Sequence, residues 1–269
     1  DKEQTALLEE TYKEFVRGGA DLASEKQEKL RAINSEIALL QLTFGQNMLK
    51  ETNAFQLVLE KQEDLAGLPV SLITTAAESA KAAGKEGKWM FTLHNPSIMP
   101  FLQFSERRDL REKMLEAYLN RGNNENEADN KEVVKKLVAL RLQKAQLMGY
   151  NNYAAFVLED RMARNEANVY QLLEQIWKPA LRKAKEEAAD LQAAMKKDGI
   201  KGKLQSWDWR YYNEKVMKAK FDIDENQLRP YFKLENVREG MFYVANRLYG
   251  ITSVSYTHLR AHETRSNLV

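Results

Sequence analysis

Apolar residues recur every three or four positions along most of this chain, which is the spacing of one face of an α-helix. The longest such stripe begins after Ser24 and extends over about seven turns at ~3.6 residues per turn; its members are Leu30, Ile33, Ile37, Leu40, Phe44 and Met48. Ser24 is expected to cap this helix, with Gln27 reaching back to it as in a capping box. Such a stripe predicts a packing face in a helical bundle rather than a cofactor-binding surface.

The same periodicity predicts further helices on either side of this one. We expect them over residues 5–16, 68–84, 106–121, 130–148, 154–158, 167–197, 208–220 and 237–248. Pro179 lies inside the longest of these ranges, so a kink or a helix start near Trp177 is expected there. Two short segments, 55–60 and 89–94, are rich in β-branched and aromatic residues and predict two strands. The predicted fold is mostly α: a multi-helix domain with one small two-stranded sheet.

Polar segments interrupt the helical pattern. An Asn-rich connector at 120–130 and a break at 198–202 separate predicted helices. From residue 253 to residue 269 the character changes, because this tail is polar, lacks helical periodicity and holds two of the three histidines. The tail resembles a spurious translated stretch of the kind carried by adapter-derived DNA. We therefore expect a truncated helical portion over residues 1–252 and a non-native tail over residues 253–269.

Composition narrows the functional classes. With 269 residues, 43% of them hydrophobic, the chain can bury a substantial core. Its 41 basic and 39 acidic residues alternate in sign and leave a formal charge of +2, which argues against partners such as nucleic acid or a membrane surface. The chain has no cysteine, which excludes disulfides and thiolate chemistry. This favours a cytoplasmic location, and a periplasmic one stays open.

The three histidines give no catalytic or metal site. His258 and His262 stand four residues apart, so on a helix both imidazoles would point to one side. The H-E-x-x-H motif of zinc peptidases needs a glutamate directly after its first histidine, and Leu259 follows His258. His94 ends the second predicted strand and precedes Asn95-Pro96, which predicts a turn. With no acid or nucleophile near it in sequence, His94 is expected to be structural. We therefore predict no catalytic residue and no metal ligand, and the substrate-binding residues stay unknown.

Several segments, in this order, resemble the thimet oligopeptidase family of zinc metallopeptidases, and most closely its bacterial peptidyl-dipeptidase (Dcp) branch. The resemblance covers residues 1–252, less than half of a family member. The segments that carry it are Asp64-Leu-Ala-Gly-Leu-Pro69, Trp89-Met-Phe-Thr-Leu-His-Asn-Pro-Ser97, Leu140-Arg through Lys144-Ala-Gln-Leu-Met-Gly-Tyr150 with Asn152-Tyr-Ala154, Leu158-Glu-Asp-Arg-Met-Ala163, Trp207-Asp-Trp-Arg-Tyr-Tyr212 and Tyr231-Phe-Lys-Leu-Glu-Asn-Val237 leading to Leu248-Tyr-Gly-Ile251.

The resemblance implies a two-lobed, mostly helical and monomeric enzyme that admits short, unstructured peptides to a deep channel. It also implies one zinc ion, held by H-E-x-x-H and a downstream glutamate, that activates the attacking water. None of these ligands lies within residues 1–252. We therefore expect a fragment of a zinc-dependent peptidyl-dipeptidase-like enzyme that binds no zinc and is inactive as this chain.

Residues 207–212 concentrate aromatic side chains and one potential ion pair. They fit either the lining of a peptide channel or a packed seam between helices, and the seam is favoured. Asp160 with Arg161, and Arg141 with Gln143 and Lys144, are expected to be solvated or bridging charges rather than clamps for a peptide carboxylate. The alternative to a peptidase fragment is a helical module that binds a peptide or a protein without chemistry.

Overall fold

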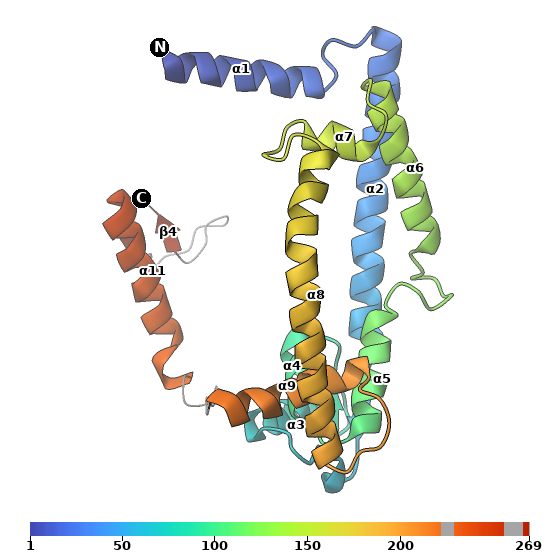
Figure 1. Cartoon of the computed structure of the whole chain (residues 1–269), viewed down its shortest axis with the longest axis vertical. Coiled ribbons are helices and arrows are strands. Elements are labelled where there is room, and N and C mark those ends of the chain that lie inside the picture. Colours follow the sequence, from blue (N-terminus) through green and yellow to red (C-terminus); the bar gives the residue numbers. More distant parts are fainter. Residues whose placement is uncertain (222–228, 256–265, 269) are drawn as a thin grey trace. The chain divides into compact units, whose positions relative to one another are not determined.

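A computed structural model describes residues 1–221, 229–255 and 266–268 of the chain (Figure 1). It is mostly helical, as the sequence predicts, and it divides into two compact units, residues 1–214 and residues 215–269. The sequence-based boundary at residues 252 and 253 rests on residue character rather than on compactness, and it stays a prediction. Among the described helices, none has both the length and the apolarity that crossing a bilayer requires.

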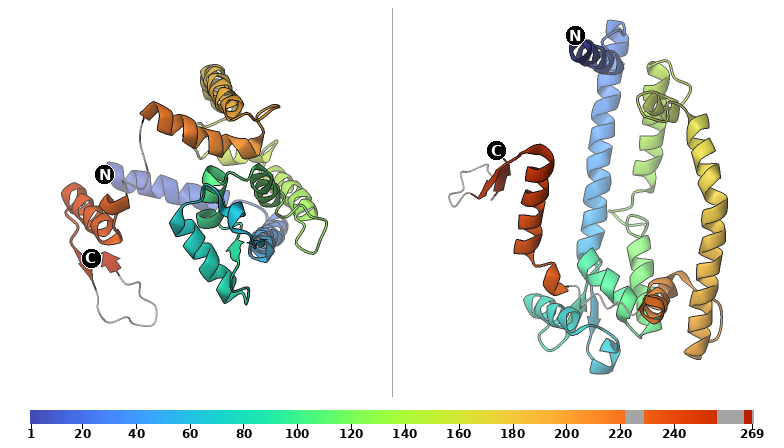
Figure 2. Two further views of the ribbon diagram at one scale, coloured as in Figure 1. Left: turned by 90° about the horizontal axis from the view of Figure 1, so that it is seen from below. Right: turned by 60° about the vertical axis from the view of Figure 1, so that its left-hand side comes forward.

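Two long helices run through the first unit. Helix α2 (Ser24–Ala54) carries the predicted apolar stripe, and α6 (Lys131–Leu147) packs along it, as the two views in Figure 2 show. Leu30 of α2 is buried, and Leu137 and Leu140 of α6 are buried or nearly so. A shorter helix, α1 (Lys2–Arg17), precedes α2, and the side chain of Asp1 caps it. Of the six stripe residues, Leu30 is buried, Phe44 is 38% exposed and the others are half-buried, so the predicted packing face is covered in part.

The small sheet organises the hydrophobic core. Strand β1 (Leu57–Leu59) pairs antiparallel with β2 (Trp89–Phe91), with Leu57 opposite Phe91. Helix α3 (Val70–Ala82) packs on β2, and α4 (Asn95–Phe104) packs on α5 (Arg108–Leu119). The rings of Phe91 and Phe101 meet edge to face with centroids 4.8 Å apart, and both side chains are fully buried. A 3-10 turn (Gln62–Leu65) links β1 to α3.

The rest of the first unit is helical. Helix α7 (Tyr153–Leu158) contacts both α6 and α8 (Glu166–Lys197), and α9 (Ser206–Phe221) begins after the predicted break at 198–202. Asn152 and Asn165 cap α7 and α8 by accepting hydrogen bonds from the amides of Ala155 and Asn168. Most predicted bounds are therefore right within a few residues.

The second unit contains α11 (Leu234–Tyr249), which follows a 3-10 turn (Arg229–Tyr231). Gly250 ends α11 in the left-handed conformation, with φ of 69°, where glycine avoids the steric cost of a side chain. Strands β3 (Ser253–Ser255) and β4 (Ser266–Leu268) form a second antiparallel pair, which the sequence pattern did not predict.

Three local predictions are wrong. Ser24 does not cap α2, since the capping position is Ala23. The side-chain amide of Gln27 instead donates to the backbone carbonyls of Ala20 and Leu22. The turn expected after His94 is the start of α4, because Pro96 fits the first turn of a helix. The helix start expected near Trp177 is wrong, because α8 is one element through Pro179; the alternative, a kink there, stays a prediction.

Candidate functional site

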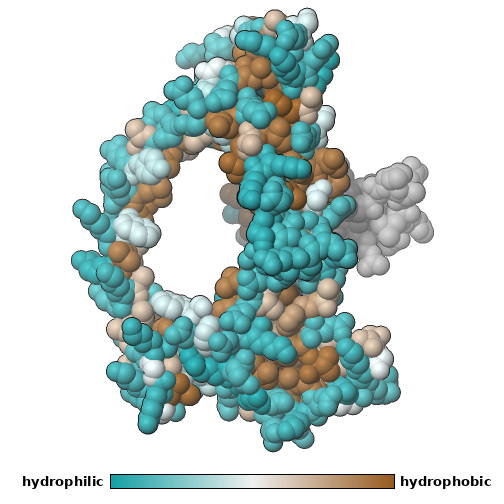
Figure 3. All heavy atoms as spheres, turned by 90° about the vertical axis from the view of Figure 1, so that its right-hand side faces the viewer, coloured by the Kyte–Doolittle hydropathy of each residue, from teal (hydrophilic) through white to brown (hydrophobic). Residues whose placement is uncertain are grey.

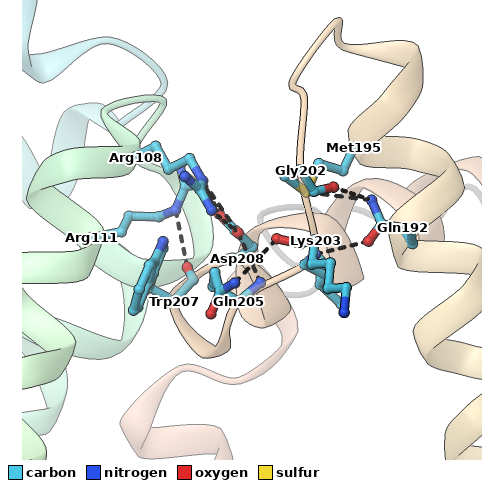
Figure 4. Close-up of polar contacts among 10 residues, drawn as sticks. Arg108, Arg111, Gln192, Met195, Gly202, Lys203, Gln205, Trp207 and Asp208 are labelled. Carbon is cyan, nitrogen blue, oxygen red and sulfur yellow. Dashed lines mark hydrogen bonds and ion pairs between the residues drawn. The ribbon is translucent and has the colours of Figure 1, made fainter.

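A buried carboxylate lies at the start of α9. Asp208 is completely buried, and both of its carboxylate oxygens accept hydrogen bonds from arginine (Figure 4). Arg108 donates from Nε at 2.9 Å and from Nη2 at 2.8 Å, in a two-point contact, and Arg111 donates from Nη2 at 3.0 Å. The backbone amide of Gln205 also donates to Asp208, at 3.1 Å. We call Asp208, Arg108 and Arg111 the Asp208 cluster.

Arg111 joins three segments of the chain. Its Nη1 donates to the Ser105 carbonyl at 2.7 Å, and its Nε donates to the Trp207 carbonyl at 3.1 Å. The guanidinium lies 4.1 Å from the centre of the Tyr211 ring, within the range of a cation–π interaction. The Arg111 side chain is 1% exposed, so each of these contacts is shielded from water. Arg111 therefore ties the end of α4 and the start of α9 to α5.

The two arginines keep Asp208 charged. Burial alone would raise the pKa of the Asp208 carboxyl, but hydrogen bonds from Arg108, the Gln205 amide and Arg111 outweigh it and hold that pKa below its ordinary value. The same pairing raises the pKa of Arg108. Because its oxygens are occupied by donors and hidden from solvent, Asp208 is placed to hold helices together rather than to exchange protons with a substrate.

The aromatic segment at 207–212 is divided between core and surface. Tyr211 and Tyr212 are buried with rings 5.1 Å apart, edge to face, whereas Trp209 is 39% exposed. This supports the predicted seam for Asp208 and both tyrosines. The ionic partners of Asp208 come from α5 and not from the adjacent Arg210. The indole nitrogen of Trp207 is buried and has no hydrogen-bond partner among the described residues.

The same region fastens the end of α8. The Gln192 side chain accepts a hydrogen bond from the Leu204 amide at 2.8 Å and donates to the Gly202 carbonyl at 3.2 Å. Leu191 and Met195 on this last part of α8 are buried. Figure 4 shows Gln192 on one side of the 202–205 connection and the Asp208 cluster on the other. The connection therefore has a fixed path between α8 and α9.

A second polar cluster joins α1 to α7. Arg17 donates to the Glu159 carboxylate at 2.8 Å and to the Phe156 carbonyl at 2.6 Å, and its guanidinium lies 4.4 Å from the Phe156 ring centre. The Tyr150 hydroxyl also donates to Glu159. That hydrogen bond, together with burial, raises the pKa of Tyr150 above its ordinary value. Lys13 forms an ion pair with Asp160 beside it.

The charges that the sequence singled out in this region lie at helix contacts. Lys144 donates to the Asn34 side chain at 2.8 Å and lies 5.7 Å from the Phe156 ring centre. Burial lowers the pKa of Lys144, and the positive charge of Arg17 adds to the shift. Arg141 lies over the Tyr153 ring at 5.4 Å. Asp160 is paired with Lys13, as expected for a bridging charge, while Arg161 is exposed.

No zinc site can be built from the described residues. His94 is exposed and precedes α4, where its backbone carbonyl accepts from the amides of Ser97 and Ile98. His258 and His262 lie outside the described residues. Within the described ranges, no three His, Cys, Asp or Glu side chains come close enough together to hold a metal ion. The donor groups present there therefore do not fit a resident zinc.

Comparison with known proteins defines the class. A model of a peptidase family matches residues 101–264, more than half of the chain, so its class is that of the peptidases. The chain belongs to peptidase family M3. This confirms the resemblance to the thimet oligopeptidase family and its peptidyl-dipeptidase branch.

Individual relatives match nearly the whole chain. Dipeptidyl carboxypeptidase of Escherichia coli is 36% identical over 255 residues, which cover 94% of this chain and 37% of the relative. Oligopeptidase A of the same bacterium is 34% identical, over 93% of this chain and 37% of the relative. The organellar oligopeptidase A of Arabidopsis thaliana is 34% identical, over 91% of this chain and 32% of its own length. The chain thus spans about a third of the length of these relatives.

Sequence reasoning missed both arginines of the Asp208 cluster. The sequence did contain a signal for Arg111. It lies about one helical turn from Met114, and both are on the buried face of α5. An arginine on the apolar face of a helix needs a buried acid or carbonyl partner. Asp208, however, lies almost a hundred residues away, and local spacing does not identify it.

Proposed function

We propose that this chain is part of a zinc-dependent oligopeptidase that hydrolyses short peptides, with a peptidyl-dipeptidase-like mode. The observation that carries the proposal is the 36% identity over 94% of the chain to a bacterial dipeptidyl carboxypeptidase. Balanced charge supports small peptides, rather than nucleic acid, as the substrates. In the complete enzyme, zinc would polarise the scissile carbonyl and activate water.

We also propose that the 269-residue chain is inactive by itself. The support is its coverage of 37% of the dipeptidyl carboxypeptidase, together with the lack of a three-ligand cluster in its described parts. The Asp208 cluster, and the second polar cluster of Arg17 with Glu159 and Phe156, contain ion pairs but no activated nucleophile. Residues 1–214 then serve as a scaffold, in which these clusters hold the helices in place.

The test is a peptidase assay on the purified chain, incubated with zinc and with an internally quenched peptide of about ten residues. We expect no cleavage that a metal chelator suppresses, and no stoichiometric zinc by metal analysis. E. coli dipeptidyl carboxypeptidase serves as the positive control for substrate and chelator. Chelator-sensitive turnover by the chain, surviving repeated chromatography, would contradict the proposed inactivity while leaving the peptidase assignment in place.

One observation bears on both the fragment and a second candidate, a non-catalytic helical module that binds a peptide or a protein. The middle of α8 exposes large apolar side chains, such as Trp177 at 65% and Ile176 at 53%. Exposed apolar patches of this kind mark interaction surfaces. A module would be monomeric at high concentration and would melt cooperatively, whereas a fragment would aggregate or bind a hydrophobic dye.

A further inference from the structure

Within the first unit, no described residue covers the middle of α8. Every residue from position 170 to position 187 is exposed, about five helical turns or 27 Å at 1.5 Å per residue. The large apolar residues along one face are exposed by 39 to 65%. We call this face the α8 stripe, and it consists of Tyr170, Leu173, Ile176, Trp177 and Leu181. In Figure 3, α8 forms the curved column of atoms on the left, which has hydrophobic side chains on the side that faces the central opening and hydrophilic ones on its outer side.

This exposure does not come from a loose helix. Asn165 caps its first turn, with a 2.9 Å hydrogen bond from the Asn168 amide. Leu191 and Met195 are buried at its other end, where Gln192 bonds to the connection that follows. Both ends of α8 are therefore held by contacts within the first unit, while the stripe between them is exposed. A surface held in this way is pre-organised for a partner, so docking costs little ordering of the helix.

The charge beside the stripe restricts the partner. Lys178, Arg182 and Lys185 follow one edge at four- and three-residue intervals, and they line a shallow hollow together with Leu181, Ala189 and one acidic residue, Glu186. None of the three forms an ion pair with another described residue, whereas Lys183 on the opposite edge pairs with Glu186 at 3.6 Å. A two-fold interface between copies of this chain would bring the patch onto itself and place like charges together. The basic edge instead matches a partner with carboxylates.

We propose that the α8 stripe is the docking surface for an amphipathic helix with an acidic edge, supplied by the further polypeptide of an M3 peptidase. Apolar side chains of that helix would cover Leu173, Ile176 and Trp177, and its carboxylates would face Lys178, Arg182 and Lys185. The choice of source rests on the proposed function, because the relatives extend far beyond the 37% that this chain matches.

The test uses Trp177 as the reporter. The probe is a designed helical peptide of about 21 residues with a leucine stripe and glutamate edges, and its twin carries lysine in place of glutamate. The glutamate peptide is expected to shift tryptophan emission to shorter wavelength in a saturable manner, and the shift should vanish in Trp177→Phe, although three other tryptophans remain. Added salt should weaken the binding, since exposed charges are screened. Equal binding of the lysine twin overturns the proposal.

Two neighbouring leucines provide a matched pair of variants. Leu173 lies on the stripe and is 53% exposed, whereas its neighbour Leu172 lies about 100° around the helix, outside the stripe, and is 57% exposed. Glutamate is a good helix former, so both variants should keep the wild-type circular dichroism. Leu173→Glu should raise the dissociation constant for the glutamate peptide at least about tenfold, the change expected for a central apolar contact. Leu172→Glu should change it less than about twofold. Equal effects of the two variants overturn the proposal.

The source is tested separately. Helical peptides tiled through the part of E. coli dipeptidyl carboxypeptidase that this chain does not match are titrated against the wild type and Leu173→Glu. At least one acidic tile should bind the wild type in a stripe-dependent manner. Binding of only the designed peptide overturns the proposed source, and a Trp177 shift with phosphatidylglycerol vesicles but with no peptide identifies a lipid surface instead. Peptidase activity is not measured here, so failure of this proposal is distinct from failure of the proposed function.

Discussion

Replacing Asp208 with asparagine removes one charge from the centre of the first unit and keeps the shape of the side chain. The amide oxygen can still accept from one arginine. Its NH2 group, however, would face a guanidinium that also donates, at a position where Asp208 now accepts from Arg108 at 2.8 Å. Arg111, which is 1% exposed, would lose its ionic partner inside the protein. The change therefore leaves a buried positive charge that keeps its two carbonyl acceptors and the Tyr211 ring but has no ionic partner.

The expected loss of stability depends on which contacts of Asp208 are buried. Removing one member of a buried ion pair typically costs about 3 to 5 kcal/mol. The contact with Arg108 contributes less, because that side chain is 33% exposed and can turn toward water. We therefore expect Asp208→Asn to lower the free energy of unfolding of the first unit by about 3 kcal/mol or more. Such a loss is a large share of the stability of an ordinary domain.

The assay is urea unfolding near neutral pH, followed by circular dichroism. Asp109→Asn is the matched control, since Asp109 in the first turn of α5 pairs with Arg107, the residue before this helix, at 2.7 Å but is 62% exposed. The control should lose less than about 1 kcal/mol. A double-mutant cycle with Arg111→Met should give a coupling energy above about 1 kcal/mol. If the two asparagine variants are equally stable, or the cycle shows no coupling, the Asp208 cluster does not hold the helices together.

Other predictions concern acid, glycine positions, the core and a helix cap. The pKa of Asp208 in the folded protein lies below its ordinary value of 3.8. The contribution of Asp208 to stability is therefore complete at pH values well above 3.8 and is lost as the pH falls through the folded pKa. Urea midpoints measured from neutral to acid pH should fall more steeply for the wild type than for Asp208→Asn. Gly67→Ala should destabilise the protein more than Gly84→Ala by at least about 1 kcal/mol. Both glycines have positive φ, but an added Cβ at Gly67 would lie 2.3 Å from the Phe104 carbonyl oxygen, whereas one at Gly84 would meet no atom within 4 Å. Equal losses of stability in the two variants would contradict the predicted clash. Phe101→Ala should cost about 3 to 5 kcal/mol in urea unfolding, as expected for a fully buried aromatic ring, and a loss below about 1 kcal/mol would show that the core is loose. Asn165→Ala should cost about 1 kcal/mol, and faster amide exchange should be confined to the first turn of α8; an unchanged exchange rate would refute the capping role.

Periodicity predicted the helices because each must bury an apolar face, and that requirement is visible within a few turns of sequence. It also predicted both strands of the core sheet, at 55–60 and 89–94, although the paired segments, Leu57–Leu59 and Trp89–Phe91, are shorter. Helix α4 was missed because Asn95 and Pro96 begin either a turn or a helix, and packing on α5 decides between them. The capping error at Ser24 has a similar cause, because Gln27 finds nearer carbonyl acceptors in the preceding turn.

The polar contacts were less predictable than the helices, for a different physical reason. Arg111 and Asp208 are separated by almost a hundred residues, and only the folded path of α5, α8 and α9 brings them within 3.0 Å. The contact of Arg17 with Glu159 likewise joins the first helix to α7. Local patterns state which side chains need a partner and do not state where that partner is. The sequence predicted Lys144 and Asp160 to be solvated or bridging charges, and it did not identify their partners, Asn34 and Lys13.

The stripes of α2 and α8 show what an apolar pattern determines. In α2, which packs along α6, Leu30 of the stripe is buried and Ile37 is half-buried, whereas in α8 every residue of a stripe with the same periodicity is exposed. Exposing large apolar side chains costs about 25 cal/mol for each Å² that could be buried, and nothing in the local structure of α8 offsets this cost. The capped first turn and the buried last turn hold the helix where a partner can reach it. A stripe kept in place but uncovered is therefore best understood as one half of an interface.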